Sequence, residues 1–496
     1  MTGVAVIGAG IGGLAAAALL AARGLDVTVL ERAESPGGKM REEAVAGRRL
    51  DAGPTVFTMR WVFEELFDAL GTALDAEVTT RRADILARHA WSADERLDLF
   101  ADPARSEAEI GTFAGAAEAR GFRDFLDRAR LIYRTLEGPF LRSPRPTPMS
   151  LAMSAGPFGM LDLWRISPFT TLWNALGTHF RDPRLRQLFG RYATYCGASP
   201  FLAPATLMLV AHVEQDGVWL VEGGMHRVAT ALAAIASRHG ASFRYGAHAE
   251  EILVRRGRAA GVRLLGGEEI AADVVISNGD SGALAGGLLG RDAARAVPRQ
   301  AARSLSAVTW AMVAEARGFP LSRHTVFFSG DYAAEFRDLL DRGTLPTDPT
   351  VYVCAQDRDD SGDGAAGPER LLVLVNAPPN GDRDGSDEAS LAACRDAAFG
   401  LMERCGLRLT PVDSVVTTPR EWEGRFPGTG GALYGAPPHG WAASFARPGA
   451  RTAIPGLYLA GGGAHPGAGV PMAAMSGRLA AESIVADLGT RMRRAG

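Results

Sequence analysis

The first forty residues constrain the possible fold of this chain more than any other stretch. Gly8, Gly10 and Gly13 have G-x-G-x-x-G spacing and follow the short apolar run Val4 to Ile7. Helix-favouring alanine and leucine come next, and a second apolar run ends on the acidic residue Glu31. This order predicts a strand–helix–strand unit that binds a dinucleotide. Gly8 permits the tight turn, Gly10 lets the backbone approach a pyrophosphate, and Gly13 lets helix and strand pack closely.

The residues just after this unit favour a flavin nucleotide over a nicotinamide one. Glu31 is placed to accept hydrogen bonds from a ribose, and the run "SPGGK" follows it, ending in Gly38 and Lys39. A second glycine pair with a base is not needed for NAD and resembles the flavin-binding variant of the motif. Lys39 is the only lysine among 53 basic residues. We therefore expect it at the cofactor; the alternative is a codon bias that left one lysine behind.

Composition excludes several classes of function. The chain has 496 residues, is 47% hydrophobic and can bury a large core. Its net charge of −3, without any basic run interleaved with aromatic residues, argues against nucleic acid as a partner. The four cysteines lack C-x-x-C spacing, which predicts neither disulfides nor a metal site and fits the cytoplasm. Since there is no leader and no uncharged run of about 18 apolar residues, we expect no membrane-spanning helix.

The predicted fold is α/β (α+β), with a Rossmann-like dinucleotide-binding domain assembled from discontinuous segments. Residues 1–60, 220–290 and 450–490 have the strand and helix patterns of this domain. Residues 61–138 look mostly helical, and residues 291–449 contain strand-like runs. We expect these last two segments to form a substrate domain with an antiparallel sheet and helices.

The segment 139–219 is expected to form a helical, apolar subdomain. Its first part, residues 139–180, is rich in Pro, Met, Phe, Trp and Leu and poor in charge. It is too broken to span a bilayer. Two interpretations stay open: core helices, or a surface that docks on a membrane.

Two loops are predicted to lie against a flavin ring. The first, residues 51–55, consists mainly of small residues that allow close approach of the backbone. The second follows a predicted strand at 457–460 and leads into a helix whose start is marked by Pro471. The dipole of that helix would stabilise negative charge on a reduced flavin. The predicted contact residues of these loops are Gly53, Pro54, Thr55, Gly461, Gly462, Pro471 and Met472.

Three polar residues near these loops are candidates for other roles. Asp51 and Asp280 are expected to cap or brace their turns rather than to catalyse. His465, in the second loop, is the candidate general base. Alternatively, His465 has a structural role in which its imidazole binds the backbone of the loop. No metal-ligating constellation is recognisable in the sequence.

Six motifs span nearly the whole chain in a fixed order. They are "GAGIGGL", "PGGK", "DAGPT", "EGGM", "ISNGD" and "LYLAGGGAHPGAGVP". Together they resemble the bacterial carotenoid (phytoene) desaturase family of flavoproteins. The stretches "GPTVFTMRWVF" and "YATYCGASPFLAPATLMLVAHVEQDGVW" look closer to its hydroxyneurosporene (methoxyneurosporene) desaturase branch from purple phototrophic bacteria. Gly462 stands where amine oxidases of the same fold carry a ribityl-binding acid, which argues against amine oxidase activity.

The resemblance implies FAD as cofactor and a carotenoid as substrate. In that branch, hydride transfer to the flavin introduces the C-3,4 double bond into a 1-hydroxy or 1-methoxy carotenoid. No second dinucleotide motif is present for a nicotinamide, so a quinone or oxygen is the expected electron acceptor. Substrate and quinone that dissolve in lipid favour a cytoplasmic enzyme bound peripherally to the inner membrane.

Two other interpretations of the sequence remain. One is a phytoene-type desaturase or another flavin oxidoreductase or isomerase that acts on an isoprenoid. The other is non-enzymatic, a prenyl-binding chaperone of similar fold without a working flavin. The intact Glu31, Lys39 and glycine loops argue against the chaperone.

Overall fold

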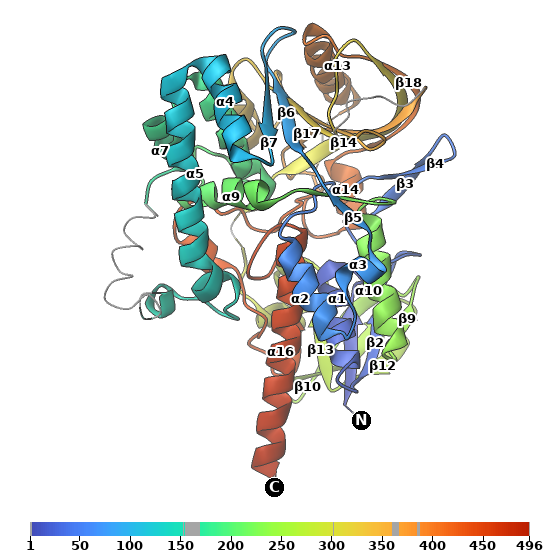
Figure 1. Cartoon of the computed structure of the whole chain (residues 1–496). Coiled ribbons are helices and arrows are strands. Elements are labelled where there is room, and N and C mark those ends of the chain that lie inside the picture. The colour runs from blue at the N-terminus through green and yellow to red at the C-terminus, as the bar shows by residue number, and fades with distance from the viewer. Residues whose placement is uncertain are drawn as a thin grey trace.

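The protein has two main sheets, which lie at opposite ends of the molecule (Figure 1). The computed structural model describes residues 2–151, 153, 169–300, 302–359, 367–383 and 387–495. A parallel sheet lies near the N-terminus, and a mostly antiparallel sheet lies at the other end. The C-terminal helix, α16 (Val470–Ala495), starts between them and runs outward past the parallel sheet.

The parallel sheet has five strands in the order β19–β13–β1–β2–β9. The strands are β1 (Gly3–Ile7), β2 (Asp26–Leu30), β9 (Ser242–Arg244), β13 (Val274–Ser277) and β19 (Leu457–Leu459). Val4 and Val6 are buried because β1 is central and pairs in parallel with β2 and β13. Strands from the beginning, middle and end of the chain therefore share one sheet.

Three helices pack beside this sheet: α1 (Ile11–Ala21), α10 (His226–Arg238) and α16. Every residue of α1 is buried, as expected for a helix of alanine, leucine, isoleucine and glycine. The contact between α1 and α16 depends on small residues. A Cβ atom on Gly477 would lie 2.0 Å from the carbonyl oxygen of Gly12. Any larger side chain at Gly477 would push the two helices apart.

The second sheet has seven strands in the order β18–β14–β17–β16–β15–β6–β7. They are β6 (Ile85–Ala90), β7 (Arg96–Phe100), β14 (Ser306–Arg317), β15 (His324–Phe327), β16 (Val351–Ala355), β17 (Glu369–Ala377) and β18 (Arg408–Thr417). The antiparallel pairing of β14 with β17 and of β16 with β15 and β17 confirms the predicted strands. The hairpin β6–β7 was not predicted within residues 61–138. Its strands are too short to stand out beside helical spacing on both sides.

A helical layer packs beside the seven-stranded sheet. It contains α4 (Pro103–Ala114), α5 (Ala116–Leu136), η1 (Glu137–Leu141), α7 (Leu172–His179), α8 (Pro183–Gly190), η2 (Arg191–Cys196), η3 (Ala205–Met208) and α9 (Leu209–Asp216). Helix α7 buries Leu172 and Leu176, as the core interpretation of residues 139–180 expects, whereas Phe169 is exposed. Residues 152 and 154–168 of that stretch lie outside the described residues.

The remaining helices and strands of the described residues lie outside the two main sheets and the helical layer. They are β3 (Glu42–Val45), β4 (Arg48–Asp51), α2 (Arg60–Ala69), α3 (Leu74–Glu77), β5 (Thr80–Arg82), β8 (Trp219–Val221), β10 (Ala249–Arg255), β11 (Arg258–Leu264), β12 (Glu269–Ala271), α11 (Ser281–Ala285), η4 (Ala293–Ala296), α12 (Tyr332–Phe336), η5 (Arg337–Arg342), α13 (Glu388–Arg404), α14 (Pro419–Arg425) and α15 (Ala443–Ala446).

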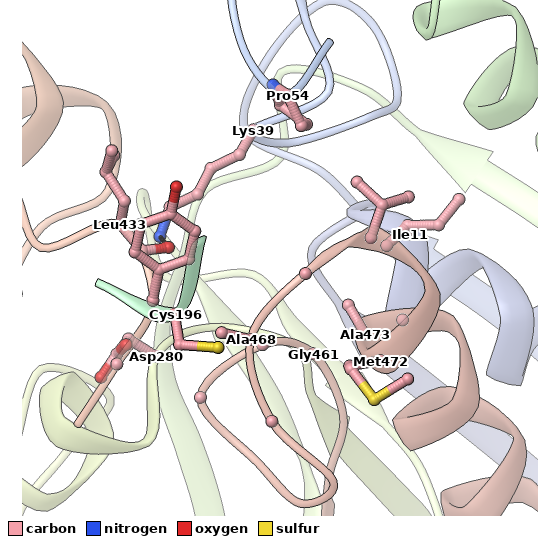
Figure 2. A pocket seen from close by; sticks show the side chains of 18 of the residues that line it. Ile11, Lys39, Pro54, Cys196, Asp280, Leu433, Gly461, Ala468, Met472 and Ala473 are labelled. Atoms are coloured by element: carbon pink, nitrogen blue, oxygen red, sulfur yellow. Dashed lines mark hydrogen bonds between the residues drawn. The ribbon is translucent and has the colours of Figure 1, made fainter. Parts of the chain in front are cut away.

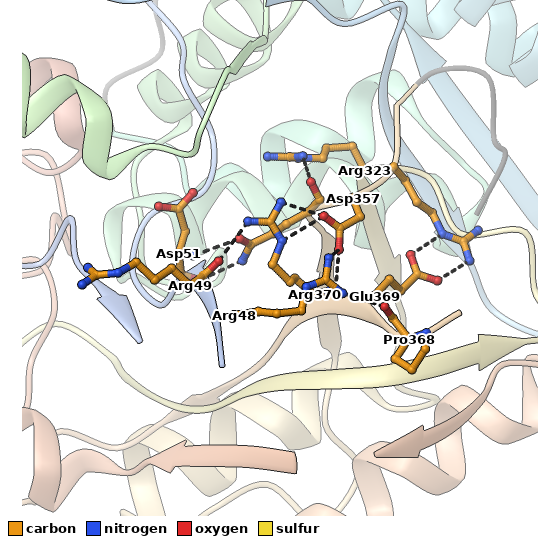
Figure 3. A network of polar contacts seen from close by, with 10 residues as sticks. Arg48, Arg49, Asp51, Arg323, Asp357, Pro368, Glu369 and Arg370 are labelled. Atoms are coloured by element: carbon orange, nitrogen blue, oxygen red, sulfur yellow. Dashed lines mark hydrogen bonds and ion pairs between the residues drawn. The ribbon is translucent and has the colours of Figure 1, made fainter. Parts of the chain in front are cut away.

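The hairpin β3–β4 is fixed to the seven-stranded sheet by a polar network (Figure 3). Arg48 and Arg370 both pair with Asp357, at 2.9 and 2.6 Å. Gln356 holds the end of β4 from both sides: it accepts the N–H of Asp51 at 2.9 Å and donates to the Asp51 carbonyl at 2.8 Å. The loop that follows Asp51 therefore starts from a fixed position and direction.

Candidate functional site

A cavity of about 830 Å³ collects the predicted cofactor residues from segments that are distant in sequence (Figure 2). It is lined by residues from the parallel sheet, the seven-stranded sheet and the helical layer. The predicted residues that line it are Gly8, Gly10, Glu31, Gly38, Lys39, Gly53, Pro54, Thr55, Gly461, Gly462, Pro471 and Met472. Gly13 is not among the described residues that line the cavity.

The N-terminus of α1 forms one wall of the cavity and is suited to bind a phosphate. No side chain caps the helix at Gly10, and its first turn holds no acidic residue, so its N–H groups can serve an anion. A Cβ atom on Gly10 would lie 2.7 Å from the side-chain nitrogen of Asn278. A Cβ atom on Gly13 would lie 2.3 Å from the Gly8 carbonyl oxygen. Gly13 therefore keeps the helix on the strand, as its spacing predicted.

Glu31 follows β2 and presents its carboxylate to the same cavity. It is 9% exposed. Oε2 accepts the N–H of Ala9 at 2.7 Å, and Oε1 accepts the N–H of Ala33 at 2.8 Å. Each oxygen keeps lone-pair capacity for a further hydrogen bond. This arrangement fits the hydroxyl groups of a ribose.

The only lysine contacts protein carbonyls. Lys39 Nζ donates to the carbonyls of Leu433 at 2.7 Å and Ala432 at 3.2 Å, and its side chain extends across the cavity toward Leu433 (Figure 2). Burial lowers the pKa of Lys39 to about 8, and the nearby Asp280 partly offsets that effect. Lys39 lines the cavity as expected and also connects the early glycine loop to a segment nearly four hundred residues later.

Asp51 and Asp280 cap helices, which confirms their predicted bracing role. The Asp51 carboxylate accepts the N–H groups of Met225 at 2.8 Å and His226 at 3.2 Å, at the start of α10. Burial raises the pKa of Asp51, and these two hydrogen bonds oppose the shift. Asp280 accepts the N–H of Gly282 at 2.7 Å and caps α11.

The loop after Asp51 packs closely on the backbone of Lys39 and lines the cavity. A Cβ atom on Gly53 would lie 1.8 Å from the Lys39 carbonyl oxygen, so this position requires glycine. Pro54 and Thr55 line the cavity next to it. The Thr55 hydroxyl lies 2.7 Å from the hydroxyl of Tyr352, which belongs to the seven-stranded sheet. The loop therefore forms the boundary between the cofactor side and the sheet side of the cavity.

The second predicted loop lies opposite and is held by an arginine that no motif marked. Arg447 donates to the carbonyls of Gly462, Tyr434 and Ala436, the last two at 2.8 and 2.6 Å. Burial lowers the pKa of Arg447. Its role could not be found from sequence because it is one of 52 arginines without a distinctive neighbourhood. Where the loop ends, the first turn of α16 places Met472 at the cavity (Figure 2).

His465 makes a structural contact, although with the backbone of η1 and not with that of its own loop. It is buried, its Nε2 lies 2.9 Å from the Phe140 carbonyl oxygen, and it is not among the described residues that line the cavity. Burial lowers the pKa of His465 to about 4. The imidazole is neutral at pH 7 and donates to that carbonyl, which fixes the loop against η1.

The remaining wall of the cavity is mostly apolar and belongs to the helical layer and the seven-stranded sheet. Its apolar lining includes Val210, Leu207, Val326, Leu372 and Leu374. Among these side chains stand a few polar ones, Arg191, Tyr195, Glu214 and Tyr352. The apolar run of β17 predicted a strand, but nothing in the sequence indicated which of its faces would meet the cavity.

Comparison with known proteins identifies the family. The family model described as flavin containing amine oxidoreductase matches residues 11–485. The chain is 56% identical to a hydroxyneurosporene desaturase of Rubrivivax gelatinosus, covering 99% of this chain and 94% of the relative. A protein of the same name from Cereibacter sphaeroides is 46% identical over 99% of both chains, and a phytoene desaturase of Neurospora crassa is 30% identical over 97% and 84%. The chain belongs to the carotenoid desaturases of this flavoprotein family.

Solved structures of low sequence identity share the fold of this chain. An oxidoreductase from Methanosarcina mazei superposes with a TM-score of 0.63 at 18% identity, covering 97% of this chain and 99% of the other. A putrescine oxidase variant gives a TM-score of 0.62 at 17% identity, covering 98% and 99%. Family membership makes this desaturase a flavin-dependent oxidoreductase. The uncapped α1 terminus, Glu31 and the glycine loops fit such a cofactor.

Proposed function

We propose that this protein is an FAD-dependent desaturase that introduces the C-3,4 double bond into a 1-hydroxy or 1-methoxy carotenoid. The observation that carries the proposal is the continuity of the cavity: one end has the features of a dinucleotide site, and the other is lined by apolar side chains. An isoprenoid chain can therefore reach the ring of a bound flavin without leaving the protein. The high identity to hydroxyneurosporene desaturases supports the choice of substrate.

The protein contributes position and exclusion of water. A bound FAD supplies a hydride acceptor. Leu372, Leu374 and Val326 provide an apolar wall that keeps a polyene in one register and keeps water out. The loop with Gly53 and the N-terminus of α16 are placed to hold the flavin ring, with the helix dipole favouring negative charge on it.

We further propose that a quinone or oxygen accepts the electrons. We also propose that the protein binds peripherally to the inner membrane. Among the described residues, no helix combines the length and apolarity needed to cross a bilayer. Met149, Met153, Phe169 and Trp441 are exposed, at 70, 76, 67 and 45%. Phe169 and Trp441 also line the cavity, and their ring centroids are 5.6 Å apart. An apolar face at the mouth of an apolar cavity supports docking on lipid, from which the substrate would enter.

Liposome sedimentation tests the docking face. The double variant Phe169→Ser with Trp441→Ser should lower the fraction bound to liposomes at least about tenfold, because two large apolar side chains lose their contact with lipid. Val412→Ser is the matched control, since Val412 is 60% exposed on β18 and does not line the cavity. Equal binding by both variants would refute this docking face.

Incubation with 1-hydroxyneurosporene, FAD and a quinone tests the activity. The polyene absorption should shift to the red, because each turnover lengthens the conjugated system by one double bond. An unchanged spectrum or a blue shift would contradict the proposed desaturation. Protein purified without any bound yellow chromophore would favour the chaperone instead.

A further inference from the structure

Under the proposed function, the group that recognises the substrate oxygen must lie close to the flavin. The oxygen on C-1 is three single bonds from C-3 and therefore within about 4 Å of it. C-3 and C-4 must themselves lie against the ring for hydrogen to leave. A polar group at the far end of the cavity could not distinguish a 1-oxygenated carotenoid. The wall next to the two ring-binding loops is where such a group is required.

Polar groups on that wall include the Thr55–Tyr352 hydroxyl pair and a buried cluster with an ion pair: Arg191, Tyr195 and Glu214, called here the η2 cluster. Arg191 pairs with Glu214 at 3.1 Å, with side chains only 5 and 4% exposed. The Tyr195 hydroxyl donates to Glu214 Oε1 at 3.0 Å and accepts a hydrogen bond from Arg191 Nη1. All three residues line the cavity among apolar neighbours.

The position of the cluster relative to the loops is set by η2. Burial raises the pKa of Cys196, the last residue of η2, and the nearby Arg447 opposes the shift; Arg447 in turn donates to the Gly462 carbonyl of the second loop. Tyr195 immediately precedes Cys196. On its other side Tyr195 is close to Tyr352: burial raises the pKa of Tyr352, and the neighbouring Cys354 and Tyr195 add to the shift. The η2 cluster therefore lies between the ring-binding loops and the seven-stranded sheet.

A buried ion pair in an apolar wall contributes little to the stability of the folded protein. Removing two charges from water costs several kcal/mol, and apolar residues of similar volume often serve stability equally well. The Nε–H of Arg191 also has no hydrogen-bond partner among the described residues. Convergent polar groups in a large, mostly apolar cavity are typical of a ligand site.

We infer that the η2 cluster binds the oxygen at C-1 of the carotenoid and thereby selects 1-oxygenated substrates. A hydroxyl group both donates and accepts, so it can use the free lone pair of Tyr195 and a donor of Arg191. A methoxyl group only accepts, so it depends on the donor alone. Burial raises the pKa of Tyr195. The phenol that faces the substrate therefore stays protonated and uncharged.

The experiment compares two substrates that differ only in the oxygen, 1-hydroxyneurosporene and 1,2-dihydroneurosporene. The protein is purified with its flavin and assayed with a quinone in liposomes, and kcat/KM is measured for each carotenoid. Wild type should prefer the hydroxylated substrate at least about tenfold. Tyr195→Phe should lower kcat/KM for that substrate about 10- to 100-fold and leave the other within about threefold.

Tyr192→Phe is the matched control. The Tyr192 hydroxyl donates to the same Glu214 but Tyr192 is not among the residues that line the cavity. It should keep the wild-type preference even if its melting temperature falls. Both phenylalanine variants lose a hydrogen bond to Glu214, but only Tyr195→Phe also removes a hydroxyl from the cavity wall.

The outcomes are distinguishable. Wild type that desaturates neither carotenoid defeats the proposed function, and the inference with it. Wild type that desaturates both carotenoids equally well overturns the inference alone, whether or not any variant folds. An active Tyr195→Phe with an unchanged preference also overturns it. Collapse of the preference in Tyr195→Phe but not in Tyr192→Phe supports it.

Discussion

The two ends of the cavity differ in composition: backbone atoms form most of one wall, and side chains form the other. At the cofactor end the wall is largely backbone: the first turns of α1 and α16 and the glycine loops that precede them. At the substrate end the wall is side chains, apolar ones such as Leu374 with the η2 cluster among them. A backbone wall binds features that every FAD has in common. A side-chain wall can be exchanged residue by residue, so it can differ between desaturases that share a cofactor.

The strongest test of the backbone end is Gly13→Ala. Its Cβ atom would overlap the Gly8 carbonyl oxygen at 2.3 Å, so α1 must move away from β1. We expect flavin content, measured by absorbance per protein, to fall at least about 100-fold, with a lower melting temperature. Gly489→Ala is the control, because a Cβ atom there meets nothing within 4 Å. Full flavin content in Gly13→Ala would mean that the helix need not touch the strand.

The substrate end should respond in the opposite way. Leu374→Trp fills part of the cavity beside the seven-stranded sheet, and we expect kcat/KM for the carotenoid to fall about 100-fold while flavin content is unchanged. Leu374→Ile, which keeps the volume, should retain activity within about threefold. Loss of flavin in Leu374→Trp would show that the two ends are not separable.

Lys39 connects the early glycine loop to the segment at Leu433, and its burial can be measured through its titration. Its folded pKa of about 8 lies below the usual lysine value of 10.5, so between these values the unfolded chain binds more protons. The free energy of unfolding of wild type, relative to Lys39→Met, should therefore be flat below pH 8 and rise by up to about 3 kcal/mol toward pH 10.5. Chemical denaturation across this range is the measurement. A relative stability that falls with pH would mean that the carbonyls of Ala432 and Leu433 outweigh the cost of burial.

The smallest effect concerns His465→Gln, which keeps a side-chain N–H donor near the Phe140 carbonyl. We expect a loss of about 1 kcal/mol in the free energy of unfolding and a kcat within about threefold of wild type. Both can be measured on the same preparation. A kcat reduced more than about 100-fold with an unchanged melting temperature would return His465 to the role of a base.

The contrast between the two ends also explains what could be predicted from the sequence. Gly8 and Gly13 were recognisable because close backbone packing restricts residue type at fixed spacing, and Glu31 because an acid ends the strand after them. The parallel sheet followed from the same pattern. Arg447 and the η2 cluster were not recognisable, since arginine, tyrosine and glutamate occur throughout the chain and meet only in the folded protein.

Two further residues show the limits of local inference. The sequence identified Lys39 as unusual but could not supply its partners, which lie in a segment almost four hundred positions away. For His465 the sequence offered two roles and could not decide between them. The contact that favours the structural role is with the Phe140 carbonyl, which approaches from a different element.

The order of strands in the parallel sheet has a consequence for the timing of synthesis. Strand β1 leaves the ribosome first, yet its neighbour β13 and the edge strand β19 follow hundreds of residues later. The cofactor end therefore cannot close until Gly461 and Met472 have been made. During translation the N-terminal strands remain without β13, with their apolar faces exposed, and the chain is prone to aggregation in that period.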